Sequence, residues 1–221
     1  MACFYVISTP IGNLEDITLR AIRILKEVDI VLCEDTRVTK RLFEKHGINT
    51  PMMSYHSQSG TAKVEAIFEE IEKEKNIALV TDAGTPGISD PGSVLIADIR
   101  SKFRQLQILA IPGASALTSA LSVAGVPTHE FTFLGFLPHK KGRETLFKEI
   151  AESERTMVFY ESTHRIMKTL ESLKKINKKI TIVREITKIY EEVLQGNAQE
   201  IFDIMSSTPE KQKGEFVVIV S

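Results

Sequence analysis

The sequence predicts an α/β protein with two α/β domains, an interpretation that depends on three observations. Short, continuous apolar runs alternate with amphipathic segments in the first half, which is typical of parallel strands joined by crossover helices. Glycine- and proline-rich turns follow several of these runs. At "GVPTHE", residues 125–130, the pattern is interrupted before a second series of strands begins. We therefore expect an N-terminal domain over residues 1–125 and a C-terminal domain over residues 126–221.

The first domain is expected to alternate strands with helices. The expected strands span residues 4–8, 29–33, 77–81 and 106–111. Apolar residues recur at helical spacing around residues 17–28, 64–71 and 94–103, and a further helix is expected within residues 112–125. Thr61 is the expected N-cap of the second of these helices. Because the strands are apolar throughout, we expect a parallel sheet that is covered by helices on both faces.

The second domain continues with strands and helices of similar length. The expected strands are "FTFLGFL" (131–137), "TMVFYE" (156–161), "ITIVREI" (180–186), "YEEVLQG" (190–196) and "EFVVIV" (215–220). Helices are expected around residues 142–153, 163–175 and 197–206. This pattern indicates a second α/β domain.

Composition excludes several classes of function. The 221 residues carry a formal net charge of -1, so a nucleic-acid partner would need a local basic patch. The apolar run at the N-terminus is too short for a signal peptide, and no run of about 18 apolar residues occurs, so we expect a cytoplasmic protein without a membrane partner. Cys3 and Cys33 lack CxxC spacing, and no histidine has the spacing of a metal ligand, so no metal site is expected.

Three turns have a design suited to ligand binding. "TPIGNLED", "DAGTPGISDPG" and "IPGASA" each follow a predicted strand, and ligands of open parallel sheets bind at the carboxyl ends of the strands. Glycine lets the main chain approach a ligand, and proline restricts the turn. The alternative is that these residues only punctuate the connections, but the second turn is longer than connections usually are. The chain lacks GxGxxG, P-loop and GxSxG motifs, so Ser89 is not expected to be a hydrolase nucleophile.

Charged residues also follow two of the predicted strands. "CEDTR" places Glu34, Asp35 and Arg37 after the second strand, and "YESTHR" places Glu161 and Arg165 after a strand of the second domain. These residues are candidates for acid–base chemistry or for binding an anion. An internal ion pair between Arg37 and a carboxylate is an equal alternative.

Two basic clusters are candidates for phosphate contacts. "HKKGRETLFK" (139–148) contains Lys140 and Lys141 next to Gly142 and follows an apolar strand, so it is a candidate for a phosphate-binding loop. "SLKKINKK" (172–179) is interpreted as a helix end whose cations lie at the negative end of the dipole. Solvated helix faces have the same composition, so the alternative remains open for both clusters.

Several motifs together resemble the ribosomal RNA methyltransferase branch of the tetrapyrrole methylase superfamily. They are "TPIGNLEDITLRA", "EDTR", "SYH", "LVTDAGTPGISDPG", "IPGASALTSALSVAG", "GFLP", "FYES" and "REITK", in this order over nearly the whole chain. The resemblance implies two α/β domains with S-adenosylmethionine in an interdomain cleft, and a homodimer. The cofactor residues that it implies are Pro10, Ile11, Asp82, Gly84, Thr85, Ile88, Ser115 and Ala116. Thr85 stands where many superfamily members have aspartate, and Ala114 where proline is expected.

The resemblance also implies a reaction, which is methyl transfer to a cytidine 2'-hydroxyl in the decoding region of small-subunit (16S) ribosomal RNA, within an assembled subunit. Four candidates for the general base remain open: Glu34, Asp35, His56 and Glu161. Arg37 and Arg165 are assigned to phosphates or to orienting these carboxylates, and Lys140 and Lys141 to phosphates. Two alternatives remain, namely methylation of a small tetrapyrrole or corrinoid substrate, and a ribosome-binding module without chemistry. Relatives of this branch commonly continue past "GEFVVIVS" into a small C-terminal module.

Overall fold

The chain folds into two α/β units, each with one five-stranded sheet, in a computed structural model that describes residues 2–221. The units are Met1–Ser115 and Ala116–Ser221. The division therefore precedes helix α5 (Ala116–Ala124), whereas the predicted boundary after residue 125 followed it. The reason is packing, because Ala120, Leu121 and Ala124 of α5 are buried against strands of the second sheet. No helix in the described residues is long and apolar enough to cross a membrane.

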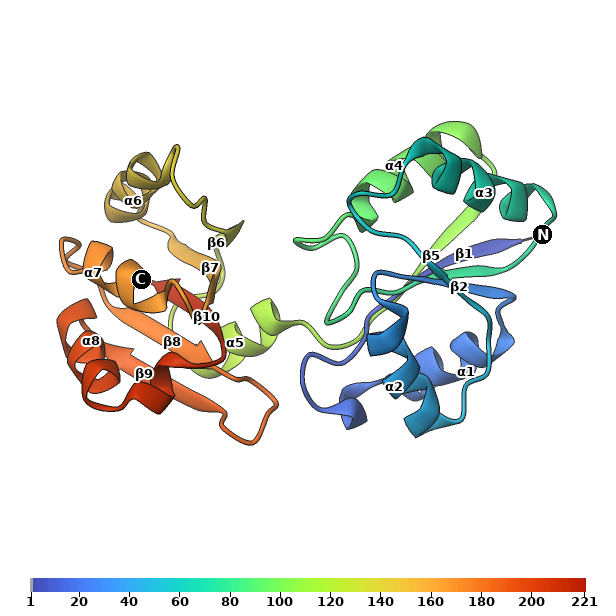
Figure 1. The fold of residues 1–221 in the computed structure, drawn as a ribbon. Helices are drawn as coiled ribbons and strands as arrows, with labels where there is room; N and C mark the ends of the chain where they lie inside the picture. The colour runs from blue at the N-terminus through green and yellow to red at the C-terminus, as the bar shows by residue number, and fades with distance from the viewer. Residues whose placement is uncertain (1) are drawn as a thin grey trace. The chain divides into compact units, whose positions relative to one another are not determined.

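The first unit holds the predicted parallel sheet (Figure 1). Its strands are β1 (Cys3–Ile7), β2 (Ile30–Cys33), β3 (Met52–Ser54), β4 (Ile77–Leu79) and β5 (Gln107–Ile111), in the order β3-β2-β4-β1-β5. Helices α1 (Leu19–Glu27) and α2 (Thr36–His46) cover one face, and α3 (Thr61–Glu72) and α4 (Gly92–Lys102) cover the other. Each face has its own buried apolar cluster, as expected for a sheet whose strands are apolar throughout.

Strand β3 and helix α2 of the first unit were not predicted, and one predicted cap was wrong. Strand β3 is only three residues long, and α2 reads "TRVTKRLFEKH", which is mostly polar. Asp35 is the N-cap of α2, and Gly47 ends the helix with a φ of +61°. The N-cap of α3 is Gly60 rather than Thr61, and no side chain caps that helix.

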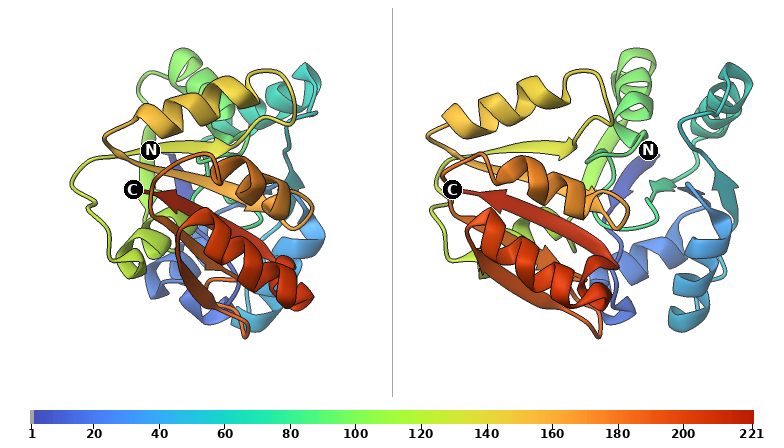
Figure 2. Two further views of the ribbon diagram at one scale, coloured as in Figure 1. Left: turned by 90° about the vertical axis from the view of Figure 1, so that its left-hand side faces the viewer. Right: turned by 60° about the vertical axis from the view of Figure 1, so that its left-hand side comes forward.

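The second unit holds a mixed sheet. Its strands are β6 (Phe131–Phe136), β7 (Thr156–Ser162), β8 (Ile180–Arg184), β9 (Glu192–Gly196) and β10 (Glu215–Val220), in the order β6-β7-β10-β8-β9. Only the pair β6–β7 is parallel. Helices α6 (Arg143–Glu152), α7 (Ile166–Leu173) and α8 (Ala198–Ser207) cover one face, and Figure 2 shows α7 and α8 lying on it. Helix α5 covers the other face, so this sheet is also buried on both sides.

Candidate functional site

The three glycine-bearing turns meet at the carboxyl edge of the first sheet. Thr9, after β1, and Gly84, after β4, exchange main-chain hydrogen bonds of 2.9 and 3.1 Å. The hydroxyl groups of Ser8 and Thr85 share a hydrogen bond of 3.0 Å, and Thr85 donates to the carbonyl of Ala114, after β5, at 3.3 Å. The parallel order β4-β1-β5 brings these turns together, because neighbouring strands end at the same edge.

Two glycines of these turns resist replacement, Gly113 because of close packing and Gly84 because of its main-chain conformation. A Cβ on Gly113 would lie 2.9 Å from the Cβ of Ser8, and a Cβ on Gly84 would lie 3.4 Å from Cγ2 of Ile11. Gly84 also has a φ of +84°, a conformation that favours glycine. Pro10 and Ile11 are buried beside these turns. The turns therefore form a compact surface of main-chain groups with apolar support.

We expect Gly113→Ala to distort this edge. The added methyl group contacts Ser8 below van der Waals distance, so the turn after β5 must move away from β1, at about 1–3 kcal/mol of unfolding free energy. Urea denaturation followed by circular dichroism measures this loss. Gly60→Ala is the matched control, because Gly60 has a negative φ and no atom within 4 Å of a Cβ. Equal stability of the two variants would contradict the close packing.

The long loop between β4 and α4 is held by a carboxylate that the sequence reading did not single out. Asp90 accepts hydrogen bonds from the main-chain N–H groups of Gly87, at 2.8 and 2.9 Å, and of Gly92, at 2.7 Å. Ser89 between them has a φ of +65°. Ile88 is exposed at this turn. The position of Asp90 between two glycines was the sequence signal for such a turn.

Three carboxylates follow β2 and β4, which are neighbours in the sheet. Glu34 accepts a hydrogen bond of 2.7 Å from the hydroxyl of Thr81, and Asp82 accepts one of 3.1 Å from the main-chain N–H of Asp35. Asp35 in turn caps α2 by accepting from the N–H of Arg37 at 2.8 Å. Thr81 also accepts through its carbonyl from the hydroxyl of Thr9, at 2.9 Å. The acidic group is therefore joined to the glycine-bearing turns.

The carboxylates differ in their proton affinity. Burial raises the pKa of Glu34, while the hydrogen bond from Thr81 opposes this shift. Burial also raises the pKa of Asp82. The hydrogen bonds from Arg37 lower the pKa of Asp35 to about 2, and its carboxylate pairs with Arg37 at 2.6 Å. Glu34 is therefore a better proton acceptor than Asp35 near neutral pH.

We expect the carboxyl group of Asp35 to titrate near pH 2, because the guanidinium of Arg37 stabilises its charged form. Because this pKa is lower in the folded than in the unfolded protein, the charged carboxylate stabilises the fold at pH values above the unfolded-state pKa. The stabilisation is lost as the pH falls through about 2. Carboxyl carbon chemical shifts measure the midpoint. In Arg37→Gln the midpoint should rise towards the ordinary value, and an unchanged midpoint would show that Arg37 is not the cause.

His56 lies at a cavity of about 940 Å³ between the segment after β3 and the start of α4, which Gly87, Ser89 and Asp90 of the long loop also line. Its Nδ1 accepts from the N–H of Gln58 at 3.3 Å. Phe68 and three carboxylates, Glu65, Asp90 and Asp98, are among the lining residues, which include no lysine or arginine. This lining is unsuited to phosphate.

Glu161 is buried in the second unit and is fully engaged. Its side chain is 0% exposed, and Oε1 accepts from Nε of Arg165 at 2.6 Å. Oε2 accepts from the hydroxyl of Thr169 at 2.6 Å and lies 3.7 Å from Nη2 of Arg143. Burial lowers the pKa of Arg143, and the charge of Glu161 opposes that shift. The structure therefore joins Glu161 and Arg165 in one buried ion-pair cluster. Arg143, which the sequence reading missed, completes it.

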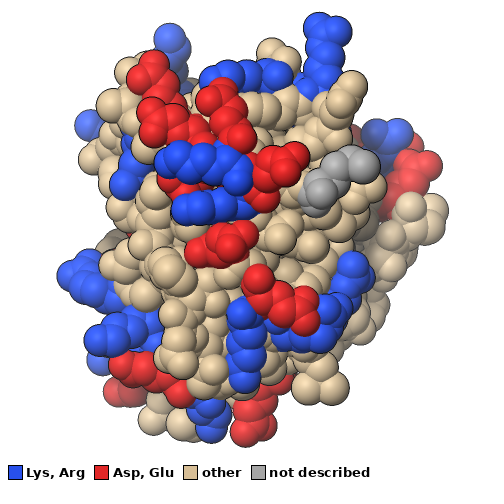
Figure 3. Space-filling model, turned by 90° about the vertical axis from the view of Figure 1, so that its right-hand side faces the viewer, with Lys and Arg blue, Asp and Glu red and all other residues tan. Residues whose placement is uncertain are grey.

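Lys140 and Lys141 are exposed and form no ion pair within the described residues. Elsewhere many lysines are paired, such as Lys102 with Glu72 at 3.1 Å. On the face drawn in Figure 3, cationic and anionic side chains are interspersed rather than separated by sign. Of the remaining predicted cofactor residues, Ser115 ends the first unit and Ala116 begins α5 in the second.

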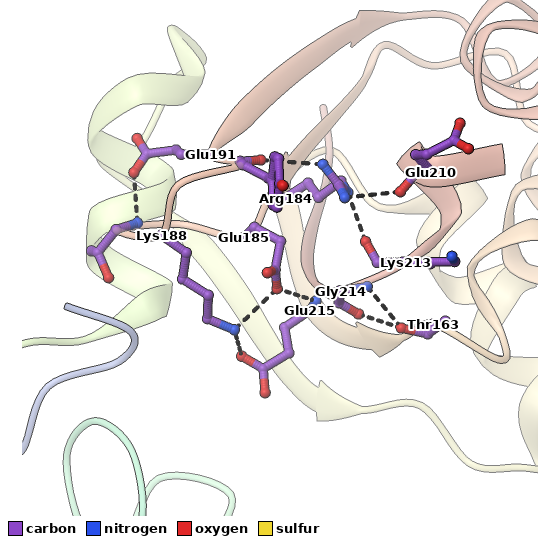
Figure 4. A network of polar contacts seen from close by, with 11 residues as sticks. Thr163, Arg184, Glu185, Lys188, Glu191, Glu210, Lys213, Gly214 and Glu215 are labelled. Carbon is purple, nitrogen blue, oxygen red and sulfur yellow. Dashed lines mark hydrogen bonds and ion pairs between the residues drawn. The ribbon is translucent and has the colours of Figure 1, made fainter. Parts of the chain in front are cut away.

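A polar network fixes the loop that carries the "REITK" motif (Figure 4). Arg184 is buried and donates to the carbonyls of Lys213, Glu210 and Tyr190 at 2.7, 2.9 and 3.2 Å. Lys188 pairs with Glu185 at 3.0 Å and with Glu215 at 2.8 Å. Glu185 and Thr187 have φ values of +50° and +67°, so the network holds a strained main chain.

Comparison with known proteins identifies the class of protein to which this fold and these converging turns belong. The family model of Tetrapyrrole (Corrin/Porphyrin) Methylases matches residues 3–201. The chain therefore belongs to the tetrapyrrole methylase family.

Relatives that are similar to this chain in sequence have a more specific name. A protein of Leptospira biflexa is 43% identical over 98% of this chain and 90% of its own length, and is named "Ribosomal RNA small subunit methyltransferase I". A protein of Thermotoga maritima with the same name is 39% identical over 100% of this chain and 99% of its own length. The chain thus resembles these relatives throughout, which confirms the resemblance drawn from its motifs.

Solved structures agree on the fold. The methyltransferase CobJ superposes with a TM-score of 0.71 at 19% identity, covering 100% of this chain and 94% of CobJ. Diphthine synthase superposes with a TM-score of 0.72 at 14% identity, covering 100% of this chain and 90% of that protein. At these identities the likeness concerns the fold alone.

Proposed function

We propose that this protein transfers a methyl group from S-adenosylmethionine to small-subunit ribosomal RNA. The observation that carries the proposal is the convergence of the turns after β1, β4 and β5 beside the carboxylate of Glu34. The names of the relatives supply the substrate class. The likeness to CobJ concerns the fold alone, so no observation favours a tetrapyrrole or corrinoid substrate.

The residues present fit the cofactor. The hydroxyl and amine groups of adenosine and methionine need hydrogen-bond partners, and their apolar parts need apolar contacts. This edge offers main-chain groups and hydroxyls for the first, and Ile11 and Ile88 for the second. The main-chain hydrogen bonds between Thr9 and Gly84, and the tight approach of Gly113 to Ser8, keep these groups in place before the ligand arrives. Bound here, S-adenosylmethionine supplies an electrophilic methyl group on a sulfonium. The full proposed set is Pro10, Ile11, Asp82, Gly84, Thr85, Ile88, Ser115 and Ala116.

Glu34 is the general base that we propose among the four candidates. Glu161 is buried in an ion-pair cluster, and Asp35 is paired with Arg37 with a pKa of about 2. His56 already accepts a hydrogen bond from the N–H of Gln58 through its Nδ1. Glu34 combines a raised pKa with a hydrogen bond from Thr81 that orients its carboxylate. It would accept the proton of the ribose hydroxyl while the oxygen attacks the methyl group.

Contacts with RNA phosphates are proposed for Lys140 and Lys141, which are exposed and unpaired within the described residues. Arg165 is proposed to position Glu161 rather than to bind RNA, because its side chain is only 14% exposed. Arg37 is 88% exposed and orients Asp35 through its Nε and Nη2, which leaves Nη1 available to a phosphate.

The finer proposal is 2'-O-methylation of a cytidine in the decoding region by a cytoplasmic homodimer that acts on assembled subunits. It is tested by incubating unmethylated small subunits with the protein and methyl-labelled S-adenosylmethionine. Primer extension at low nucleotide concentration then maps the modified ribose. Label in RNA, with a stop next to one cytidine, is the expected result. Cofactor binding without any label in RNA would refute the proposed activity and leave a binding module.

A further inference from the structure

A β-bulge near the end of β6 aligns an aromatic side chain with the neighbouring strand. Strands β6 and β7 are parallel, with Phe133 beside Val158, so a regular ladder would place Gly135 beside Tyr160. The observed partner of Tyr160 is Phe136, because the register shifts by one residue. Gly135 has a φ of +62°, which glycine adopts readily. The bulge therefore brings Phe136 next to Tyr160.

Three aromatic rings gather as a result. Phe133 and Tyr160 contact edge to face with centroids 4.9 Å apart, and Phe136 contacts Tyr160 in the same way at 5.4 Å. Phe133 and Tyr160 pack against the buried cluster around α5, whereas Phe136 is 57% exposed. Phe136 is therefore a supported aromatic ring with more than half of its surface in solvent, and such rings stack with unpaired bases.

A basic loop follows Phe136 after Leu137 and Pro138. Lys140 and Lys141 are four and five positions further along the chain, and both are exposed. The start of this loop is anchored, because Nη1 of Arg143 donates to the carbonyl of Pro138 at 3.3 Å. An exposed aromatic ring followed within five residues by unpaired cations is a combination that suits single-stranded nucleic acid.

We infer that Phe136 stacks on an unpaired base of the RNA substrate while Lys140 and Lys141 contact the phosphates beside it. This inference rests on the proposed function, and it adds that the bound RNA is single-stranded at this point. Charge complementarity favours RNA over an apolar protein partner, since Leu137 is buried and the exposed residues after it include Lys140 and Lys141. A duplex would hide the faces of its bases from Phe136.

The test measures binding of a fluorescein-labelled single-stranded RNA of about 12 nucleotides, within the range of single-strand grooves, to the full chain by anisotropy. Phe136→Leu should weaken binding about 5- to 100-fold, and Phe136→Tyr should retain it. Phe136→Leu should leave the slope of log Kd against log salt unchanged. The double variant Lys140→Gln, Lys141→Gln should reduce that slope by about 1.4, since each phosphate contact on a single strand contributes roughly 0.7.

Phe131→Leu is the matched control, because Phe131 is on the same strand, 39% exposed, and has no aromatic contact in the described residues. The inference is overturned if Phe136→Leu binds RNA as tightly as this control, or if the unaltered chain prefers duplex to single-stranded RNA. It is also overturned if Phe136→Leu weakens S-adenosylmethionine binding instead, which would make adenine the occupant. Methylation is not measured, so failure here is separate from failure of the proposed activity.

Discussion

Glu34→Gln is expected to lower kcat for RNA methylation about 10²- to 10⁴-fold, the usual contribution of a general base. The amide keeps the shape of the side chain and still accepts the hydrogen bond from Thr81, but it cannot take a proton from the ribose hydroxyl. Cofactor affinity should not change, because the proposed role is in chemistry. Single-turnover rates with saturating RNA, together with calorimetric titration of S-adenosylmethionine, separate the two effects.

The pH dependence provides a second measurement of the same role. The carboxylate is the active form, so the rate is present above the folded-state pKa of Glu34 and is lost as the pH falls through it. Burial raises this pKa, and the hydrogen bond from Thr81 lowers it. Thr81→Val should therefore move the acidic limb of the kcat profile to higher pH, and Glu34→Gln should abolish the limb.

The neighbouring carboxylate is the matched control. Asp35→Asn keeps an N-cap for α2 and should change kcat little, since Asp35 is paired with Arg37. The assignment fails if Asp35→Asn loses as much activity as Glu34→Gln. It also fails if Glu34→Gln weakens cofactor binding in proportion to its loss of rate, because Glu34 would then hold the cofactor.

The sheet of the first unit was predictable because its central strands β2 and β4 are buried on both faces. All four residues of β2 are buried, so the apolar run appears in the sequence without interruption. Helix α2 was missed because its buried side comprises only Thr39, Leu42 and Phe43 within a polar segment. Its cap, Asp35, was the stronger signal, and it was interpreted instead as a candidate catalytic residue.

Contacts that depend on the order of strands in the sheet could not be predicted from the sequence. Glu34 and Thr81 are 47 positions apart and meet because β2 lies beside β4. Apolar patterning fixes the faces of a strand but not its neighbours in the sheet. The bulge at Gly135 could have been predicted from the sequence, since a glycine inside a strand pattern is itself a sign of a bulge.

Glu161→Ala is expected to lower the free energy of unfolding by about 3–5 kcal/mol, because it leaves the buried guanidinium groups of Arg143 and Arg165 without their carboxylate. The side chain of Glu161 is 0% exposed, so water cannot replace the lost partner. Urea denaturation of the full chain, followed by circular dichroism, should show the loss as a transition at lower urea concentration. Glu130→Gln removes a pair that is 61% and 64% exposed and should change stability by about 0–1 kcal/mol.

The physical cause of this loss of stability is also testable. An uncompensated buried charge lowers the free energy of unfolding, whereas apolar replacement of the whole ion-pair cluster does not. The triple variant Arg143→Met, Glu161→Leu, Arg165→Met should therefore recover most of the stability that Glu161→Ala loses. The stability and kcat of Glu161→Gln distinguish a structural role of Glu161 from a catalytic one. If this variant unfolds at the same urea concentration as the unaltered chain but has lost its kcat, Glu161 rather than Glu34 accepts the proton.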